Sequence, residues 1–320
     1  MAILRQMATL ILREHRRLPI KGTVVTIGRQ SVALTRDEAN KLLIQEGVPI
    51  RDARLVEVDE ATVGSSGLNY ISDRSFFSMF SEAKVLSLDV SAYEGADIVH
   101  DLNTPLPSHL RSMADFIYNG SCLDNLFDPA SAIKAMSQML RPCGRIIHAE
   151  HGSPIQGALI CYSPEWFFNF YAVNDYVQCV TLKAKFEHLI GDWRVIPWKA
   201  YAEGDGKLVP AQSTEGKDDF VVITIATKGR SSTDDKTPIQ GHYRVLQQRE
   251  DHDLYLQKFR EFTSCTPSYA ESEFVLKGAE TPVTFQRRII VCIRTLLRKI
   301  AHTLGCDPLL VWLLGRPLRP

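Results

Sequence analysis

Ordered cysteine patterns are absent from this sequence. Its seven cysteines are scattered along 320 residues, and no two of them stand as a C-x-x-C pair. Structural zinc sites and disulfide frameworks use regular cysteine spacing, so both are disfavoured and a reducing compartment is favoured. His148 and His151 stand close together but have no cysteine or carboxylate partner in a known ligand pattern, so no metal is expected.

An excess of charge of either sign is also absent. Lys plus Arg number 37, and so do Asp plus Glu. The chain therefore has no excess of basic residues, and no nucleic-acid partner is expected. No apolar run approaches the length of about 18 residues that a spanning helix needs. The N-terminal stretch MAILRQMATLILREHRR has an interrupted apolar run and no small-residue cleavage site, so we expect a cytoplasmic protein.

Glycine is scarce where dinucleotide-binding proteins concentrate it. Residues 23–28, TVVTIG, read as a buried strand that ends in glycine, and the loop IGRQSV contains Gly28 alone. One glycine permits a single close backbone approach or one positive φ. The G-x-G-x-x-G fingerprint is therefore missing, and no Tyr-x-x-x-Lys pair follows it. A nicotinamide-dependent oxidoreductase stays a weaker alternative.

One continuous stretch, residues 115–152, reads as a strand–helix–strand unit. DFIYNG is a β-favouring run that breaks into the polar loop NGS. Asp128 is a candidate N-cap, and Pro129 follows at the first helical position, where a missing N–H costs nothing. The LRPCG stretch ends the helix, and a second apolar strand begins. This order predicts a parallel crossover, whose ligands bind beyond the carboxyl ends of the strands.

Elements of the same kinds extend on both sides of that unit. Thr35 and Glu38 form a capping-box pattern, and KVLSLD (84–89) reads as a strand that ends in an acid. WRVIPW and DFVVITIATKG read as two late strands with no helix between them. The sequence therefore predicts an α/β fold: a Rossmann-like, mainly parallel sheet with helices on both faces and an antiparallel terminal hairpin.

The composition divides the chain into three parts. Residues 1–230 are predicted as the sheet domain, within which the less regular residues 48–83 form an insertion or lid outside the central sheet. Residues 231–286 turn polar and are predicted as an irregular linker or appendage. Residues 287–320 are predicted as a basic, amphipathic helical tail, because arginines alternate with an apolar helical face.

That tail has two interpretations. Most amphipathic helices cover a core, so residues 287–320 would pack on the domain or form a homodimer contact. A basic amphipathic helix followed by an apolar stretch with Trp312 is also typical of a peripheral contact with a membrane surface. Both alternatives stay open at this point.

The stretch from Lys84 to Gly152 resembles the class I S-adenosylmethionine (SAM)-dependent methyltransferases. The matching pieces are KVLSLD, HDLNTPLP, DFIYNGSCLDNLFDP and LRPCGR; SLDVSAYEGADIVHDLN and YSPEWFF narrow the likeness to a bacterial subgroup of methyltransferase-like proteins. The resemblance covers about residues 20–228. It departs at the first loop, where the family has several glycines near the methionine part of the cofactor and this chain has IGRQSV.

The resemblance implies SAM as the cofactor and a set of contacts at the strand ends. Asp89 would hold the ribose hydroxyls, and its alternative role is that of a solvated acid. Asp101 would lie by the adenine amino group, and its alternative role is an Asx turn with Asn103. His148 and His151 are the catalytic candidates, as general bases, with a structural role as the alternative. The implied cofactor-binding residues are Gly28, Asp89, Val90, Asp101, Leu102, Asn119, Gly120 and Ser121.

The function that follows is SAM-dependent methyl transfer to a small-molecule or saccharide acceptor. An acceptor that must lose a proton would need a base, and the protein would otherwise supply positioning and desolvation. The alternative is a non-catalytic protein that binds a nucleotide or a partner on the same scaffold, which the missing glycines favour. Titration with SAM and with NAD(H) separates these possibilities, because the protein would bind the first, the second or neither.

Overall fold

The structure is a computed structural model, and it describes residues 2–51, 56–62, 64–65, 67–154, 158–199, 219–239 and 249–279. Contacts divide the chain after Gly278 into two units, and every element below belongs to the first. The predicted tail, residues 287–320, lies outside the described residues. Its helix and its dimer or membrane contact therefore stay predictions.

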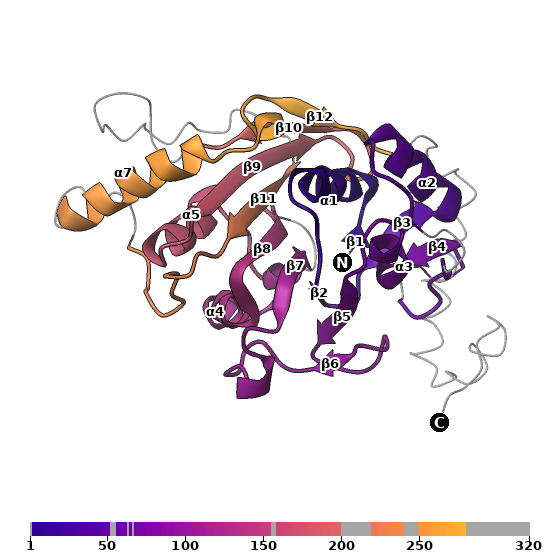
Figure 1. Cartoon of the computed structure of the whole chain (residues 1–320), viewed down its shortest axis with the longest axis horizontal. Helices are drawn as coiled ribbons and strands as arrows, with labels where there is room; N and C mark the ends of the chain where they lie inside the picture. The colour runs from indigo at the N-terminus through magenta and orange to yellow at the C-terminus, as the bar shows by residue number, and fades with distance from the viewer. Residues whose placement is uncertain are drawn as a thin grey trace. The chain divides into compact units, whose positions relative to one another are not determined.

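A nine-stranded sheet organises the described part of the chain (Figure 1). Five neighbouring strands, β6-β5-β2-β7-β8, run parallel to one another. Beyond β8 the order is β11-β9-β10-β12, and each of these strands is antiparallel to the one before it. In chain order the strands are β2 (Thr23–Ile27), β5 (Lys84–Asp89), β6 (Ile98–Val99), β7 (Ala114–Gly120), β8 (Leu140–His151), β9 (Gln178–Phe186), β10 (Trp193–Pro197), β11 (Asp219–Thr227) and β12 (Phe274–Leu276).

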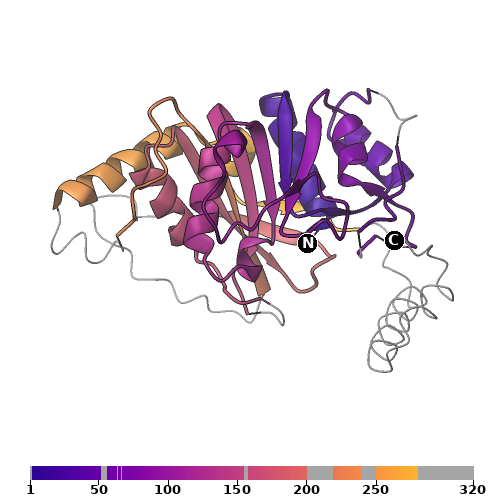
Figure 2. The ribbon, with the colours of Figure 1, turned by 90° about the horizontal axis from the view of Figure 1, so that it is seen from below.

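Helices cover both faces of this sheet, as the sequence predicts. One core contains side chains of α1 (Arg5–Arg17), α2 (Arg36–Gln45) and α3 (Asp73–Ser78). The other contains side chains of α4 (Pro129–Met139), α5 (Pro164–Val173) and α7 (Arg249–Ser264). Val24 and Val25, adjacent on β2, enter opposite cores because successive side chains of a strand point to opposite faces. Figures 1 and 2 show the two groups of helices on opposite sides of the strands.

The α/β fold class is confirmed, but the antiparallel strands pair with different partners from those predicted. The two late strands of the predicted hairpin, β10 and β11, do not pair, because β9 lies between them. The strand β9 is not predicted from the sequence. Six consecutive residues of β11 are buried, so both of its faces need cover and it lies inside the sheet, whereas β10 is only half-buried.

The predicted linker, residues 231–286, is corrected by the structure over its described part. Residues 249–264 form α7, and Phe274–Leu276 form β12, which pairs with β10 at the edge of the central sheet. The helix has a polar average composition, and among its described side chains only a narrow stripe that includes Tyr255 and Phe262 is buried. A narrow stripe on a charged helix is easily taken for irregular chain, because the charged face dominates the composition.

Residues 48–83 give no described strand to the central sheet. They contribute β4 (Tyr70–Ser72), which joins β1 (Ala2–Ile3) and β3 (Ser31–Thr35) in a separate three-stranded sheet. They also contribute α3, whose Phe76 and Phe77 are fully buried in the core with Phe116 of β7. Motion of this segment as a lid stays a prediction.

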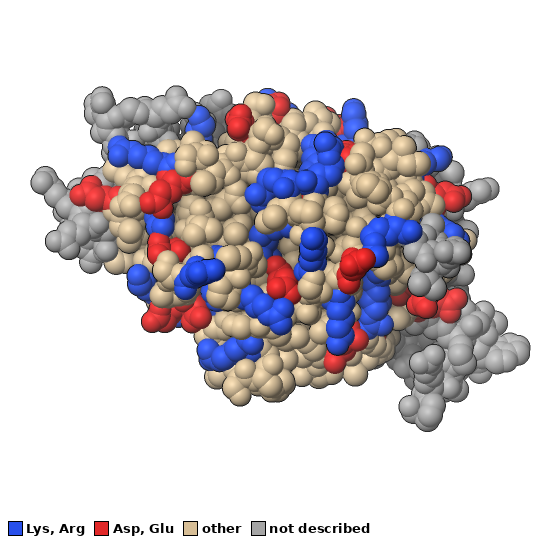
Figure 3. Space-filling model, in the orientation of Figure 1, with Lys and Arg blue, Asp and Glu red and all other residues tan. Residues whose placement is uncertain are grey.

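Three short 3-10 helices connect these elements: η1 (Ser108–Leu110), η2 (Leu123–Asn125) and η3 (Ser268–Ala270). On the face drawn in Figure 3, basic and acidic side chains are interspersed among uncharged ones. Among the described residues, no helix has the length and apolar character needed to cross a membrane.

Candidate functional site

The carboxyl ends of β2, β5, β7 and β8 meet at one edge of the sheet. Ile27, the last residue of β2, pairs with Leu88 on one side and with Asn119 on the other. The next residue, Gly28, has φ +72° and donates its N–H to the Leu88 carbonyl at 2.6 Å. A positive φ at this turn favours glycine. Gly28 therefore ties the first loop to the end of β5, where ligands of parallel sheets bind.

Asp89 ends β5 with a carboxylate that is largely uncommitted. The side chain is half-buried, and its Oδ1 accepts one long hydrogen bond, 3.4 Å, from the Ser91 N–H. Val90 beside it is 65% exposed. A carboxylate at a strand end with free lone pairs can accept bonds from the hydroxyls of a ligand.

Asp101 forms the Asx turn that the sequence offers as its alternative role. Its Oδ1 accepts from the backbone N–H of Asn103 at 2.9 Å and from the Asn103 side-chain amide at 2.8 Å. These bonds lower the pKa of the exposed carboxyl. Leu102 is buried in the core under the turn. The second oxygen of Asp101 remains for a ligand.

Asn119 and His148 form a buried pair between β7 and β8. The two residues are register partners, and the Asn119 amide nitrogen lies 2.8 Å from His148 Nδ1. His148 Nε2 lies 2.6 Å from the hydroxyl of Tyr171 on α5. Burial lowers the pKa of His148 to about 3, so the imidazole is neutral. With no exposed surface and both ring nitrogens engaged, His148 holds its neighbours in place in this structure.

Glu150 lies at this edge and is not predicted from the sequence. It is fully buried and accepts from the Asn119 amide at 2.6 Å and from the backbone N–H groups of Cys122, Leu123 and Asp124 at 3.2–3.3 Å. Burial, with the nearby Asp124 charge, raises its pKa well above the ordinary value. The available signal was the acidic residue in HAEH, which directly follows the apolar pair Ile146-Ile147 in the same strand.

The loop after β7 is shaped by these contacts. Ser121 has φ +58°, donates its N–H to the Ala149 carbonyl at 2.8 Å, and donates its hydroxyl to Asp124 Oδ2 at 2.5 Å. His151 lies at the rim of the same loop, with Nε2 3.8 Å from Asp124 Oδ2. Burial lowers the pKa of His151, and the Asp124 charge partly offsets that effect. His151 is therefore a neutral, partly accessible imidazole beside a carboxylate.

Gly120 separates this loop from the first one. A Cβ at Gly120 would lie 2.7 Å from Tyr118 Cε1 and 2.8 Å from Gln30 Oε1. Gln30 is buried and donates its side-chain amide to the Ile27 carbonyl at 2.7 Å. Any side chain at Gly120 would therefore displace Gln30 or Tyr118.

A buried ion-pair cluster fills the first loop in place of glycines. Arg29 is 5% exposed, with Nη2 3.2 Å from Asp73 Oδ1 and 3.7 Å from Asp59 Oδ1. Asp73 also accepts from the Gln30 N–H at 3.3 Å. Burial raises the pKa of Asp73 despite the nearby Arg29 charge. Residues from the inserted segment thus hold the loop after β2 closed.

No family model matches the chain, and no curated protein matches it. Among solved structures, the CMeT domain of the citrinin polyketide synthase is similar over 70% of this chain, at 14% identity and a TM-score of 0.35; the match spans only 52% of that protein. A possible histamine N-methyltransferase from Thermotoga maritima is similar over 70% of this chain and 91% of its own, at 16% identity and a TM-score of 0.34. A SAM-dependent methyltransferase from Archaeoglobus fulgidus is similar over 69% and 94%, at 11% identity and a TM-score of 0.34.

These TM-scores are low, so the fold is assigned from the strand order itself. Counted along the chain, the central strands lie in the order third, second, first, fourth, fifth, with β6, β5, β2, β7 and β8 in those places. This is the doubly wound order, and its switch point falls between β2 and β7. The antiparallel β11 then lies between β8 and β9. The described part of the chain therefore has a Rossmann-like, doubly wound α/β fold with an antiparallel extension.

Proposed function

We propose that this protein transfers a methyl group from SAM to a small-molecule or saccharide acceptor. The observation that carries the proposal is the uncommitted Asp89 carboxylate at the end of β5, beside the switch point of the sheet. Asp89 would hold the ribose hydroxyls, and the free oxygen of Asp101 would face the adenine amino group. Gly28, Val90 and Leu102 would provide backbone and apolar surface around them.

Polar atoms at the ends of β7 and β8 support a ligand at this edge. The Asn119 Oδ1, the Tyr118 hydroxyl and the His151 Nδ1 are buried, and none has a hydrogen-bond partner among the described residues. Buried polar atoms are normally paired, so an unpaired group near a strand end is consistent with a ligand or a water that completes it. The residues present thus fit the nucleoside half of SAM.

The methionine half meets a different surface from the glycine-rich loop of the family. Arg29, Gln30 and Asp73 fill the loop after β2 with side chains that bond to one another. Methyl transfer by this protein therefore depends on the loop after β7, with Asn119, Gly120 and Ser121, to line the remainder of the cofactor's path.

SAM, when bound, supplies a methyl group that carries positive character. The protein's own part is to orient the acceptor and, where the acceptor must lose a proton, to accept it. His151 suits that role because its neutral Nε2 can take a proton while Asp124, 3.8 Å away, stabilises the resulting charge. His148 would act as a positioning residue that fixes Asn119.

Calorimetric titration of the wild type and of Asp89→Ala with SAM tests the proposal. Two hydrogen bonds to a carboxylate contribute about 1.5–3 kcal/mol each. Asp89→Ala should therefore weaken SAM binding by about a hundredfold or more, with an unchanged unfolding transition. The matched variant Asp101→Ala keeps Asp89 and loses a carboxylate that is already bonded to Asn103, so its effect should be smaller. Equal affinity of the wild type and Asp89→Ala would contradict the assignment.

A second candidate is the non-catalytic nucleotide-binding protein. The Arg29–Asp73–Asp59 cluster favours it, because a loop held closed by buried ion pairs suits the nucleoside half of SAM better than the whole molecule. In that case adenosine should bind as tightly as SAM, and no methyl transfer should occur. Titration with NAD(H) in the same experiment tests the weaker oxidoreductase alternative.

A further inference from the structure

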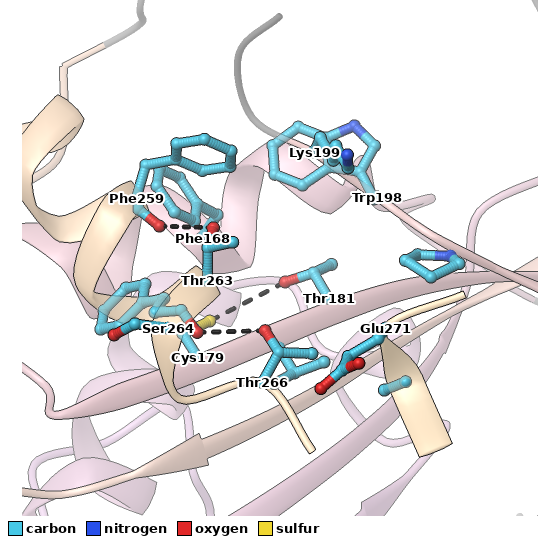
Figure 4. A pocket seen from close by; sticks show the side chains of 14 residues that line it. Phe168, Cys179, Thr181, Trp198, Lys199, Phe259, Thr263, Ser264, Thr266 and Glu271 are labelled. Carbon is cyan, nitrogen blue, oxygen red and sulfur yellow. Dashed lines mark hydrogen bonds between the residues drawn. The ribbon is translucent and has the colours of Figure 1, made fainter. Parts of the chain in front are cut away.

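A second ligand-sized hollow lies apart from the candidate site. A cavity of about 310 Å³ opens between the start of β9, the end of β10, α5 and the C-terminal part of α7 (Figure 4). Cys179 at its floor pairs with Ala226 of β11, which pairs with Ile146 of β8. Ile146 precedes His151 by five residues in the same strand, so about 16 Å of strand separates the two levels. Binding in this cavity is therefore a separate event from binding at Asp89.

Helix α5 stands between the cavity and the candidate site. Phe167 contacts the His148 ring at 4.9 Å between centroids. The next residue, Phe168, lines the cavity instead. The two sites thus contact different sides of one helix.

Aromatic rings form one wall of the cavity. The Phe168 ring meets Trp198 edge-on at 5.8 Å and Phe259 edge-on at 6.4 Å between centroids. Trp198 is held by its backbone N–H, which donates to the Thr181 carbonyl at 2.9 Å where β10 leaves β9. Phe168, Phe259 and Trp198 come together in Figure 4. Faces of such rings attract cations and apolar groups.

The polar groups of the cavity are mainly acceptors. The hydroxyls of Thr263, Ser264 and Thr266 donate to the carbonyls of Phe259, Glu261 and Phe262 at 2.7–3.1 Å. Each hydroxyl has thereby used its hydrogen and can only accept from a ligand. They lie at the C-terminal end of α7, which is the negative end of the helix dipole.

Among the described residues that line the cavity, Glu271 and Lys199 carry formal charge, and both side chains are exposed. The Glu271 carboxylate adds to the acceptor character of the α7 end. Lys199 lies beside Trp198 in Figure 4 and brings a positive charge to this side of the cavity. Glu271 would attract a cationic ligand and Lys199 would repel it. Variants of the two residues therefore test the charge of the ligand.

We propose that this cavity binds a small organic cation, a primary or quaternary ammonium group on an apolar or aromatic body. The ammonium group would meet the Glu271 carboxylate, the hydroxyl oxygens and the C-terminal end of α7. The apolar body would pack on Phe168, Trp198 and Phe259. The volume equals that of about ten water molecules, which suits a ligand of one ring and a short amine chain.

Three probes of matched shape test the charge: 2-phenylethylamine, 2-phenylethanol and 3-phenylpropionate, each titrated into the full chain by calorimetry. The amine should bind about tenfold more tightly than the alcohol, because only the amine carries the charge that the rings and acceptors attract. The carboxylate should bind most weakly. Preference for the carboxylate, equal binding of amine and alcohol, or no binding of any probe would overturn the proposal.

Variants locate the binding. Glu271→Gln should weaken amine binding by about threefold, as expected for an exposed ion pair, and Lys199→Gln should leave it equal or tighter. The control Glu273→Gln changes a carboxylate two positions away that pairs with Arg194 outside the cavity, and it should have no effect. Trp198→Leu should weaken amine binding by about tenfold, and Asp89→Ala should leave it unchanged. An effect of Glu273→Gln equal to that of Glu271→Gln would show that general surface charge, and not this cavity, attracts the amine.

Discussion

Arg29 occupies the place where the family resemblance leads one to expect glycine. Its guanidinium is buried between Asp59 and Asp73, which come from the segment inserted between α2 and β5. Two carboxylates are kept in the interior by one cation, and hydrogen bonds from the backbone support Asp73. A charge in this position is costly to leave unpaired, so Arg29 and its two carboxylates stabilise one another.

The Arg29→Ala variant should lose about 3 kcal/mol of unfolding free energy at neutral pH, because two buried carboxylates lose their cation. The loss should shrink at acidic pH, where Asp73, with its raised pKa, takes up a proton. The measurement is urea unfolding at two pH values. The control Arg51→Ala breaks an exposed pair with Glu82, and it should cost about 0–1 kcal/mol. Equal losses of unfolding free energy in both variants would show that the buried cluster contributes no more than an exposed ion pair.

His151 should titrate below pH 6.5, because burial disfavours its charged form. Asp124→Asn removes the negative charge 3.8 Å from Nε2 and should lower the His151 pKa further. NMR titration of the imidazole ring protons in both proteins measures this. A rise of the pKa in Asp124→Asn would mean that Asp124 does not act on His151 through its charge.

At the scale of single elements, α2 and α4 begin with the capping residues that the sequence predicts. Thr35 accepts from the Glu38 N–H, and the Glu38 carboxylate accepts from the Thr35 N–H at 2.8 Å, so the predicted capping box is present. Asp128 likewise accepts from the Ser131 N–H at 3.0 Å, with Pro129 at the first helical position. Ser163 also precedes a proline and begins α5, yet its side chain makes no capping bond.

This difference gives a matched pair of variants. Thr35→Ala should cost about 1 kcal/mol of stability, since it leaves backbone donors of α2 without their acceptor. Ser163→Ala removes the same kind of hydroxyl from a position that makes no such bond, and it should cost much less. Thermal and denaturant unfolding of the two variants test the comparison. A larger loss for Ser163→Ala would reverse the assignment of the caps.

On the scale of the whole molecule, one buried network joins distant parts of the chain. Glu14 of α1 accepts from Arg17 and from Arg145 of β8, each at 2.7 Å, and from the Tyr269 hydroxyl near β12. Burial alone would raise the pKa of Glu14, but Arg17, Tyr269 and Arg145 outweigh it and the pKa is lowered. The network therefore fastens the N-terminal helix to both the parallel and the antiparallel parts of the sheet.

A lowered carboxyl pKa stabilises the folded state above the unfolded value of 4.5, and this stability is lost as the pH falls through the folded pKa. Glu14→Gln should therefore be less stable than the wild type at neutral pH, by about 3 kcal/mol, since Arg145 loses its buried partner. The gap should close as the pH falls below 4.5. Unfolding free energies of both proteins across this range test it. A gap that does not change with pH would show that the charge of Glu14 contributes nothing.

The sequence by itself determined the elements whose signals are local. The strands that became β2 and β5, the β7–α4–β8 crossover, the caps of α2 and α4, and Asp89 at a strand end all follow from periodicity, capping and turn chemistry within a few residues. For Asp101 the sequence offered two roles, and the structure shows the Asx turn.

Only the tertiary structure decided which elements are neighbours. The place of β11 between β8 and β9, the pairing of β12 with β10, and the contact of Arg29 with Asp73 join residues far apart in the chain. Glu150 likewise became visible as the anchor of the loop after β7 only when its partners were placed. Such contacts depend on which faces and charges remain to be covered after the local elements have formed, and no single segment contains that information.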